Sequence, residues 1–244
     1  MNKSLGHTFH IPVLGVAFSV DAPLKVAKYG ISSVISLVDD TLMERLRKHY
    51  LEKLGLTYFP IEEKEKDARA NRVAAYLNMI KGIVSEQFEG LKKSPFAEGS
   101  EITKYFEMLP DSSDLKIRYN EMLAETDKKN QSELQKKLRS DIYAGSIEAN
   151  IMTKLDKANY DDNGVQLSNE FNDAHASLRG FAMSELESSI VFSAGMNPKL
   201  CSYIETFKDF YPDAECNFKK KIVIKVSDYR SALIQGKLDR KSVV

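Results

Sequence analysis

The sequence predicts an α/β fold built from parallel strand–helix repeats and interrupted by a long α-helical insertion. Short apolar runs of strand length are each followed by a helical pattern that begins with a capping residue. Two such repeats fit within residues 1–60, and charged residues at helical spacing dominate from about residue 62 to residue 140. Because short connections between strands and helices make neighbouring strands parallel, we expect an open doubly wound sheet or a closed barrel.

The first repeat begins with a continuous apolar run from Phe9 to Val20. Such a run is typical of a strand that is covered on both faces, as strands in parallel sheets are. Pro12 and Gly15 interrupt it, and it is far shorter than the ~20 residues of a membrane span, so we expect a buried strand rather than a signal peptide. Asp21 is placed to cap the following helix, and Gly30 to end it.

The second repeat consists of a β-branched strand from Ile31 to Val38 and a helix that is capped by Asp39 or Asp40 and ends at Gly55. The insertion follows, and it contains helical runs that are separated by Pro and Gly breaks. We expect three helices in an antiparallel cap or hairpin, at Ala68 to Leu91, Glu101 to Met108 and Leu115 to Leu138.

Strand–helix alternation then returns for three further units. The expected strands are Ile147 to Thr153, Ser189 to Ala194 and Lys221 to Val226, and the expected helices lie near 172–184, 200–207 and 229–235. This organisation assigns residues 1–60 to the first two units, 61–141 to the insertion, and 142–244 to units three to five of the same domain. An eight-unit barrel needs ~250 residues without any insertion, so five units form either an open sheet or part of a barrel.

Composition excludes several classes of function. The 35 basic and 35 acidic residues cancel, so no long-range attraction to nucleic acid or to anionic lipid is expected. Only Cys201 and Cys216 are present, which is too few for the disulfide framework of a small secreted domain and fits a cytoplasmic protein. The four histidines include no pair at the i, i+4 spacing of a helical metal site, so we expect no metal.

Two lysines stand at the carboxyl ends of predicted strands, where active sites of parallel α/β proteins lie. Lys154 and Lys225 each follow an apolar strand, at a place where a solvated lysine is not expected. Such lysines can hold an anionic group, polarise a carbonyl or form a Schiff base. The alternative is an ion pair with Asp156 or Asp228 that ties strand ends together; we favour the functional interpretation.

Two other strand ends carry features suited to a ligand. Gly15 lets a flat ligand or a phosphate approach the backbone, although tight packing against a neighbouring strand explains it equally well. Ser193, Gly195 and Asn197 form a turn that opens a helix, which suits an oxyanion or phosphate oxygen as well as an ordinary helix cap. Sequence motifs for classical dinucleotide binding, for a P-loop and for a serine nucleophile elbow do not occur.

Polar residues gather on the helix expected after the third strand. Asn172, Asp173, His175 and Arg179 lie on it, and Asp173 with His175 could serve in proton transfer. A polar outer face of the helix is the interpretation that we favour.

Four segments carry a resemblance to known proteins. FHIPVLGVAFSVDAPLKVAKYGISSVISLVDD, GSIEANIMTKLDKANYDDNG, FNDAHASLRGFAMSELESSIVFSAGMNP and KKIVIKVSDYRSALIQGK resemble the N-terminal part of an uncharacterised bacterial protein family whose members are longer. The order of elements also resembles the FMN-dependent TIM barrels of the glutamate synthase and nitronate monooxygenase type. That resemblance implies an aldolase-type TIM barrel, here partial with about five βα units. The last two strands, which hold the phosphate in those enzymes, have no counterpart in this chain.

The same resemblance implies a set of site residues. The end of the first strand, at Gly15, Val16 and Ala17, would contact FMN, while Lys154 and Lys225 would assist flavin or substrate. We add Ser193, Gly195 and Asn197 to the expected cofactor contacts, because their turn suits a phosphate oxygen. The leading expectation is therefore an FMN-dependent oxidoreductase acting on a small molecule.

Two alternatives stay open. One is a flavin-free lyase or aldolase in which Lys225 forms a Schiff base and Asp228 is its proton partner. The other is a non-catalytic interaction protein that uses the helical insertion.

Overall fold

The computed structural model describes residues 20–153, 156–192, 198–226, 228–230 and 232–234. These residues fall into two compact units. The helical unit comprises residues 21–33 and 82–147, and the sheet unit comprises residue 20, residues 34–81 and the described residues from 148 onward. None of the described helices combines the length and the apolar character that a bilayer crossing requires.

A parallel four-stranded sheet confirms the α/β class. Its strands are β1 (Ser33–Leu37), β2 (Ile147–Ile151), β3 (Ser189–Phe192) and β4 (Lys221–Ile224), and they lie in the order β1-β2-β3-β4. Each of them matches an expected strand. The expected strand from Phe9 to Val20 lies outside the described residues except for Val20.

The register of the sheet follows from its backbone hydrogen bonds. Ala149 pairs with Ile190, which in turn pairs with Ile222, so β2, β3 and β4 run parallel. Between β1 and β2, the amide of Ser33 donates to the carbonyl of Ser146 (3.0 Å) and the amide of Met152 donates to the carbonyl of Leu37 (3.1 Å). In a parallel ladder, these two bonds place Ser36 directly opposite Asn150.

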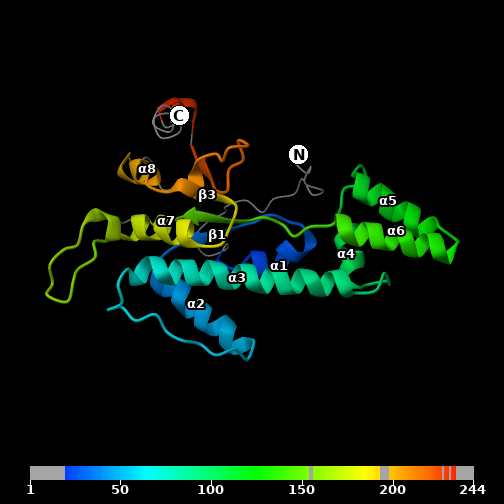
Figure 1. Cartoon of the computed structure of the whole chain (residues 1–244), viewed down its shortest axis with the longest axis horizontal. Coiled ribbons are helices and arrows are strands. Elements are labelled where there is room, and N and C mark those ends of the chain that lie inside the picture. Colours follow the sequence, from blue (N-terminus) through cyan, green and yellow to red (C-terminus); the bar gives the residue numbers. More distant parts are fainter. Residues whose placement is uncertain (1–19, 154–155, 193–197, 227, 231, 235–244) are drawn as a thin grey trace. The chain divides into compact units, whose positions relative to one another are not determined.

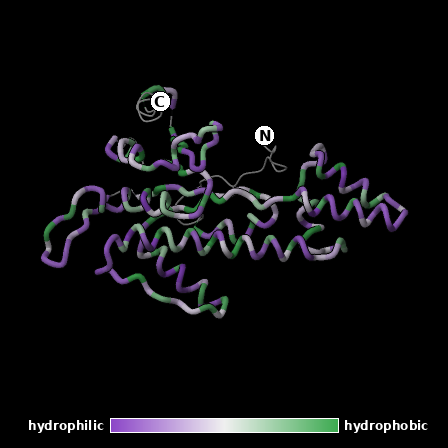
Figure 2. Tube along the Cα trace, viewed as in Figure 1, coloured by the Kyte–Doolittle hydropathy of each residue, from purple (hydrophilic) through white to green (hydrophobic). Residues whose placement is uncertain are grey.

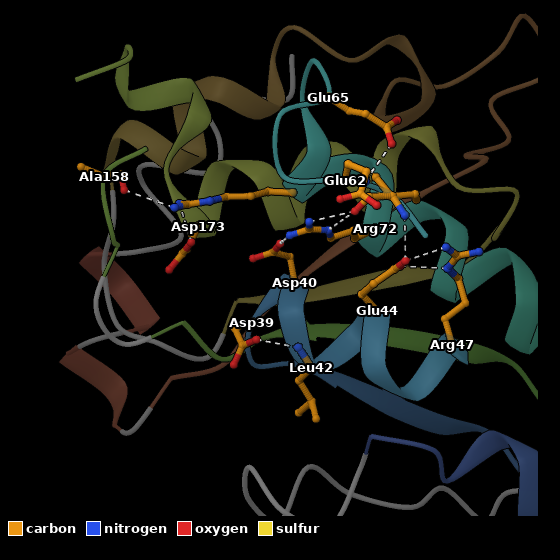
Figure 3. Close-up of polar contacts among 12 residues, drawn as sticks. Asp39, Asp40, Leu42, Glu44, Arg47, Glu62, Glu65, Arg72, Ala158 and Asp173 are labelled. Carbon is orange, nitrogen blue, oxygen red and sulfur yellow. Dashed lines mark hydrogen bonds and ion pairs between the residues drawn. The ribbon is translucent and has the colours of Figure 1, made fainter. Parts of the chain in front are cut away.

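The helices that follow the strands begin where the sequence predicts. Asp39 caps α2 (Asp40–Lys53), because its side chain accepts a 2.7 Å hydrogen bond from the amide of Leu42 (Figure 3). The other two are α7 (Asp173–Met183) and α8 (Pro198–Ile204), which confirm the helices expected after the third and fourth strands. Helix α1 (Pro23–Val26) and a 3₁₀ turn after it precede β1, and Gly30 ends that turn in a left-handed conformation, as expected. The expectation that Asp21 caps this helix is wrong, because Ala22 occupies the N-cap position and makes no side-chain capping bond.

Helix α3 (Ala68–Lys93) begins in the sheet unit, where it runs alongside α7 (Figure 1). The approach is close at Gly180 of α7, since a Cβ atom there would lie 2.7 Å from the carbonyl oxygen of Ala70 and 2.7 Å from the Cβ of Val73. Only glycine permits this separation of the two helices. The division between the two units falls within α3, between Lys81 and Gly82.

The helical unit corrects one expectation. The single helix expected from Leu115 to Leu138 is two helices, α5 (Asp114–Ala124) and α6 (Lys128–Asp141), which lie side by side as a hairpin (Figure 1). Asp127 causes the break, because its side chain accepts a hydrogen bond from the amide of Lys129 and starts a new helix. With α4 (Glu101–Glu107) and α3, the insertion therefore holds four described helices rather than three.

An aromatic core holds the helical unit together. The rings of Phe106 and Tyr119 stack with centroids 4.8 Å apart and planes 3° from parallel, and Tyr105 and Phe96 flank them. Figure 2 shows polar and apolar residues alternating along α5 and α6, as expected of helices with one buried face.

Candidate functional site

Most residues expected to form the site lie outside the described residues. These are Lys154, Gly15, Val16, Ala17, Ser193, Gly195 and Asn197. Lys225 and Asp228 are described, and both are exposed to solvent. The amide of Lys225 extends the sheet by donating to the carbonyl of Phe192 (3.1 Å). The premise that a solvated lysine is out of place at this strand end is therefore wrong for Lys225, because β4 lies at the edge of the described sheet.

Two buried polar side chains lie next to each other on one face of the sheet. Ser36 of β1 and Asn150 of β2 are opposite one another and are both 0 % exposed. Within the described structure, the Ser36 hydroxyl and both polar atoms of the Asn150 amide have no hydrogen-bond partner. The neighbouring residue on β3, opposite Asn150, is Val191, whose side chain cannot form a hydrogen bond. An unpaired buried polar group costs about 1 to 3 kcal/mol, so these three atoms are candidates for contact with a bound water or ligand.

A second polar group lies where α7 begins. The Asp156 carboxylate accepts a hydrogen bond from the amide of Ala174 (2.9 Å) and one from the side-chain amide of Asn172 (3.4 Å). It also lies 3.5 Å from Nδ1 of His175. Asn172 occupies the N-cap position without a capping bond of its own, so Asp156 takes over that role from the segment after β2.

The interpretation of this helix face as polar and outward-facing is wrong. Asn172, Asp173 and His175 are all buried. Helices α3 and α8 cover them, through contacts such as Arg69 to Asp173 and the ring of Tyr203 against His175, 5.2 Å between centroids. The helix is enclosed on several sides, and its polar side chains meet partners from other elements instead of water.

The expected pairing of Asp173 with His175 is also different in the structure. Asp173 forms an ion pair with Arg69 (2.6 Å), whose guanidinium also binds the carbonyl of Lys157 and that of Ala158, which is labelled with Asp173 in Figure 3. Burial raises the pKa of Asp173, although Arg69 acts in the opposite direction. His175 instead faces Asp156, which sequence spacing does not reveal.

Ion pairs fix the segments around this site. Arg72 of α3 binds Asp40, the first residue of α2 (2.8 Å), and the carbonyl of Ile61 (Figure 3). Arg179 of α7 binds both oxygens of Asp67, each at 2.5 Å, and the hydroxyl of Tyr203. These bonds join the segment before α3 to α3 and α7, and they also connect α3 with α2 and α7 with α8.

Glu44 anchors the chain that leaves α2. Its carboxylate accepts hydrogen bonds from Arg47 (Figure 3), from the Tyr58 hydroxyl (2.7 Å) and from the amide of Ile61 (3.0 Å). Burial alone would raise the pKa of Glu44, but these bonds lower it. Burial and the neighbouring Glu44 together raise the pKa of Tyr58 to about 12. This cluster is structural, because all its hydrogen bonds join parts of the chain.

Sequence reasoning assigned neither Ser36 nor Asn150 to the site, and it named Asp156 only as a possible ion-pair partner of a strand-end lysine. Asn150 is a polar residue inside an otherwise buried strand, which is itself an indication of function. Ser36 gave no such signal, since serine is common in strands, and the contacts of Asp156 with the start of α7 depend on packing that the sequence does not show. Comparison of the chain with protein-family models, with curated proteins and with solved structures found no match.

Proposed function

We propose that the chain carries the N-terminal units of an aldolase-type TIM barrel and that the protein is an FMN-dependent oxidoreductase acting on a small molecule. The strand order supports the barrel. Parallel neighbours that follow each other in chain order, with helices between them, wind in one direction, as in a barrel. A doubly wound sheet instead reverses its strand order at a switch point.

The observation that carries the proposed cofactor is the unpaired Ser36–Asn150 pair. Together the two side chains offer one amide donor, one amide acceptor and one hydroxyl, all buried and close to the carboxyl ends of β1 and β2. The pyrimidine edge of a flavin alternates carbonyl oxygens with an N–H group, so it can satisfy an amide side chain on both sides. In this proposal Asn150 would orient the flavin ring and Ser36 would support it.

When bound, FMN would supply the redox chemistry, and the chain would orient it and exclude water. Gly15, Val16, Ala17, Ser193, Gly195 and Asn197 remain the proposed contacts to the cofactor. Lys154 remains the proposed cation near the ring or the substrate.

The lyase alternative receives less support. A Schiff-base lysine needs surroundings that lower its pKa by removing water, and Lys225 is exposed.

We also propose a cytoplasmic location for the protein. The balanced charge of the chain and its two free cysteines support this location.

An absorbance spectrum of the purified protein between the near-ultraviolet and the blue tests the proposal, followed by titration with FMN while flavin fluorescence is recorded. We expect a flavin band or saturable quenching in the wild-type protein. Asn150→Leu should abolish binding, and the matched change Asn130→Leu, at an exposed position of α6, should leave it intact. Wild-type protein that neither contains nor binds FMN would refute the proposal.

A further inference from the structure

The Asp156 carboxylate faces Nδ1 of His175, as in a proton-transfer pair, but the two groups are not hydrogen-bonded. The Asp156 carboxylate is held in place by the amide of Ala174 and the side chain of Asn172, and it lies 3.5 Å from Nδ1 of His175. A carboxylate at this position favours the tautomer in which Nδ1 carries the hydrogen, which leaves a lone pair on Nε2. The same carboxylate stabilises the imidazolium that forms when Nε2 accepts a proton.

The surroundings differ from those of a histidine that only fills a core. A core histidine normally has its ring nitrogens hydrogen-bonded, whereas Nδ1 of His175 lacks a hydrogen bond and its contact with Asp156 is long. Catalytic hydrogen bonds are often long before a ligand binds. The His175 side chain is only 4 % exposed.

Two further buried polar atoms, one at the start of α7 and one just beyond β2, lack partners among the described residues. They are the side-chain oxygen of Asn172, at a residue 8 % exposed, and the hydroxyl of Thr153, at a residue 9 % exposed, just beyond β2. The side-chain nitrogen of Asn172 donates to Asp156, which fixes the orientation of the amide. The side-chain oxygen of Asn172 is therefore free to accept a hydrogen bond from an O–H or N–H group of a ligand. Thr153 can donate or accept.

Neighbouring charges are already matched. Arg179 is bound to Asp67 and Tyr203, and Asp173 is bound to Arg69. The guanidinium groups of Arg179 and Arg69 are thus paired with other carboxylates, and Asp156 is the carboxylate that faces His175.

We propose that His175 is a proton acceptor for a small molecule that bears a hydroxyl or amino group, with Asp156 as its positioning residue. The proton moves from the ligand to Nε2, the electron pair stays on the ligand, and the resulting imidazolium pairs with Asp156. The step requires no oxidant or reductant. It goes beyond the proposed redox function and does not depend on a flavin.

The test measures the tautomer of His175 by nitrogen-15 NMR in the wild-type protein at alkaline pH, together with carbethoxylation of His175 by diethyl pyrocarbonate, read by mass spectrometry. His49, exposed on α2, is the internal reference. We expect the hydrogen on Nδ1 and measurable modification at Nε2. In Asp156→Asn, the hydrogen should shift toward Nε2 and the modification should slow relative to His49.

Asp156→Asn retains an oxygen for the Ala174 amide, and the amide NMR spectrum verifies that the fold is intact. The matched control is Asp173→Asn, which alters the adjacent carboxylate bound to Arg69 and should leave the His175 tautomer unchanged. The proposal is overturned if wild-type His175 carries its hydrogen on Nε2, if Asp156→Asn leaves the tautomer unchanged, or if His175 stays unmodified while His49 reacts.

Discussion

The buried side chain of Lys220 donates a 2.6 Å hydrogen bond to the carbonyl of Phe181, in the last turn of α7. A second bond, of 2.7 Å, reaches the carbonyl of Ser184. Carbonyls at the end of a helix have no partner within the helix, and a cation there is also favoured by the helix dipole. Lys220, which is 0 % exposed, therefore closes the end of the helix whose beginning carries His175.

Replacing this lysine should destabilise the sheet unit. Lys220→Met keeps the apolar stem but leaves two buried carbonyls without a donor, so we expect the free energy of unfolding to fall by about 2 to 4 kcal/mol. Urea denaturation measures the change. Lys219→Met, at the exposed neighbouring residue, is the matched control and should have little effect. Equal stability of Lys220→Met and wild type would show that the two bonds contribute nothing.

Lys220 also predicts a pH dependence. Burial lowers the pKa of Lys220 to about 8, from 10.5 for a free side chain. Between these two values the unfolded chain binds more protons than the folded one, so the contribution of Lys220 to stability rises with pH across this window. A neutral amine still has enough hydrogens for both carbonyls. The slope of unfolding free energy against pH should be smaller in Lys220→Met; an identical slope would contradict the prediction.

We expect the stability of the helical unit to fall at acid pH, where Glu101 becomes protonated. Hydrogen bonds from Lys28 (2.5 Å) and Tyr29 (2.7 Å) lower the pKa of Glu101 to about 2, from 4.5. Because the folded pKa is depressed, the stabilisation is complete above about 4.5 and is lost as the pH falls toward 2. Glu101→Gln should therefore be less stable than wild type at neutral pH, and the two should converge in acid. A stability difference that is the same at every pH would argue against this ion pair.

Replacing Gly145 by a residue with a side chain should strongly destabilise the protein. A Cβ atom at this position would collide with the carbonyl group of Ile31 and lie 2.7 Å from the amide nitrogen of Ser32. These neighbours are backbone atoms and cannot turn aside, so Gly145→Ala should cost about 3 kcal/mol or more. Gly90→Ala is the control, since a Cβ there meets nothing within 4 Å and lies inside α3. That change should stabilise by about 0.5 to 1 kcal/mol. Thermal unfolding of both variants tests the contrast.

Asn150 predicts a conflict between stability and binding. Asn150→Leu removes two unpaired buried polar atoms and keeps the side-chain volume, so it should raise the free energy of unfolding by about 1 kcal/mol or more in the absence of ligand. Calorimetry without and with FMN measures this. If Asn150 is retained for binding and not for stability, its replacement by leucine should give a protein that is more stable but no longer binds FMN. Destabilisation by Asn150→Leu would show that the amide has a structural role.

The sequence by itself determined the local elements of this protein. Four β-branched runs became four parallel strands, and helix starts followed capping residues such as Asp39. These features depend on neighbours a few residues apart, so periodicity and capping chemistry reveal them. Periodicity predicted one helix where the structure has two, α5 and α6. The pattern of apolar residues continues through both, and only the cap at Asp127 separates them.

Only the tertiary structure decided which polar groups meet and which are buried. The spacing of Asp173 and His175 suggested a pair, yet Asp173 binds Arg69 and His175 faces Asp156. The Ser36–Asn150 pair likewise depends on the register between two strands that the whole insertion separates in the chain. Such contacts arise from the packing of distant segments, where burial removes water and leaves each polar group to find a partner within the fold or in a ligand.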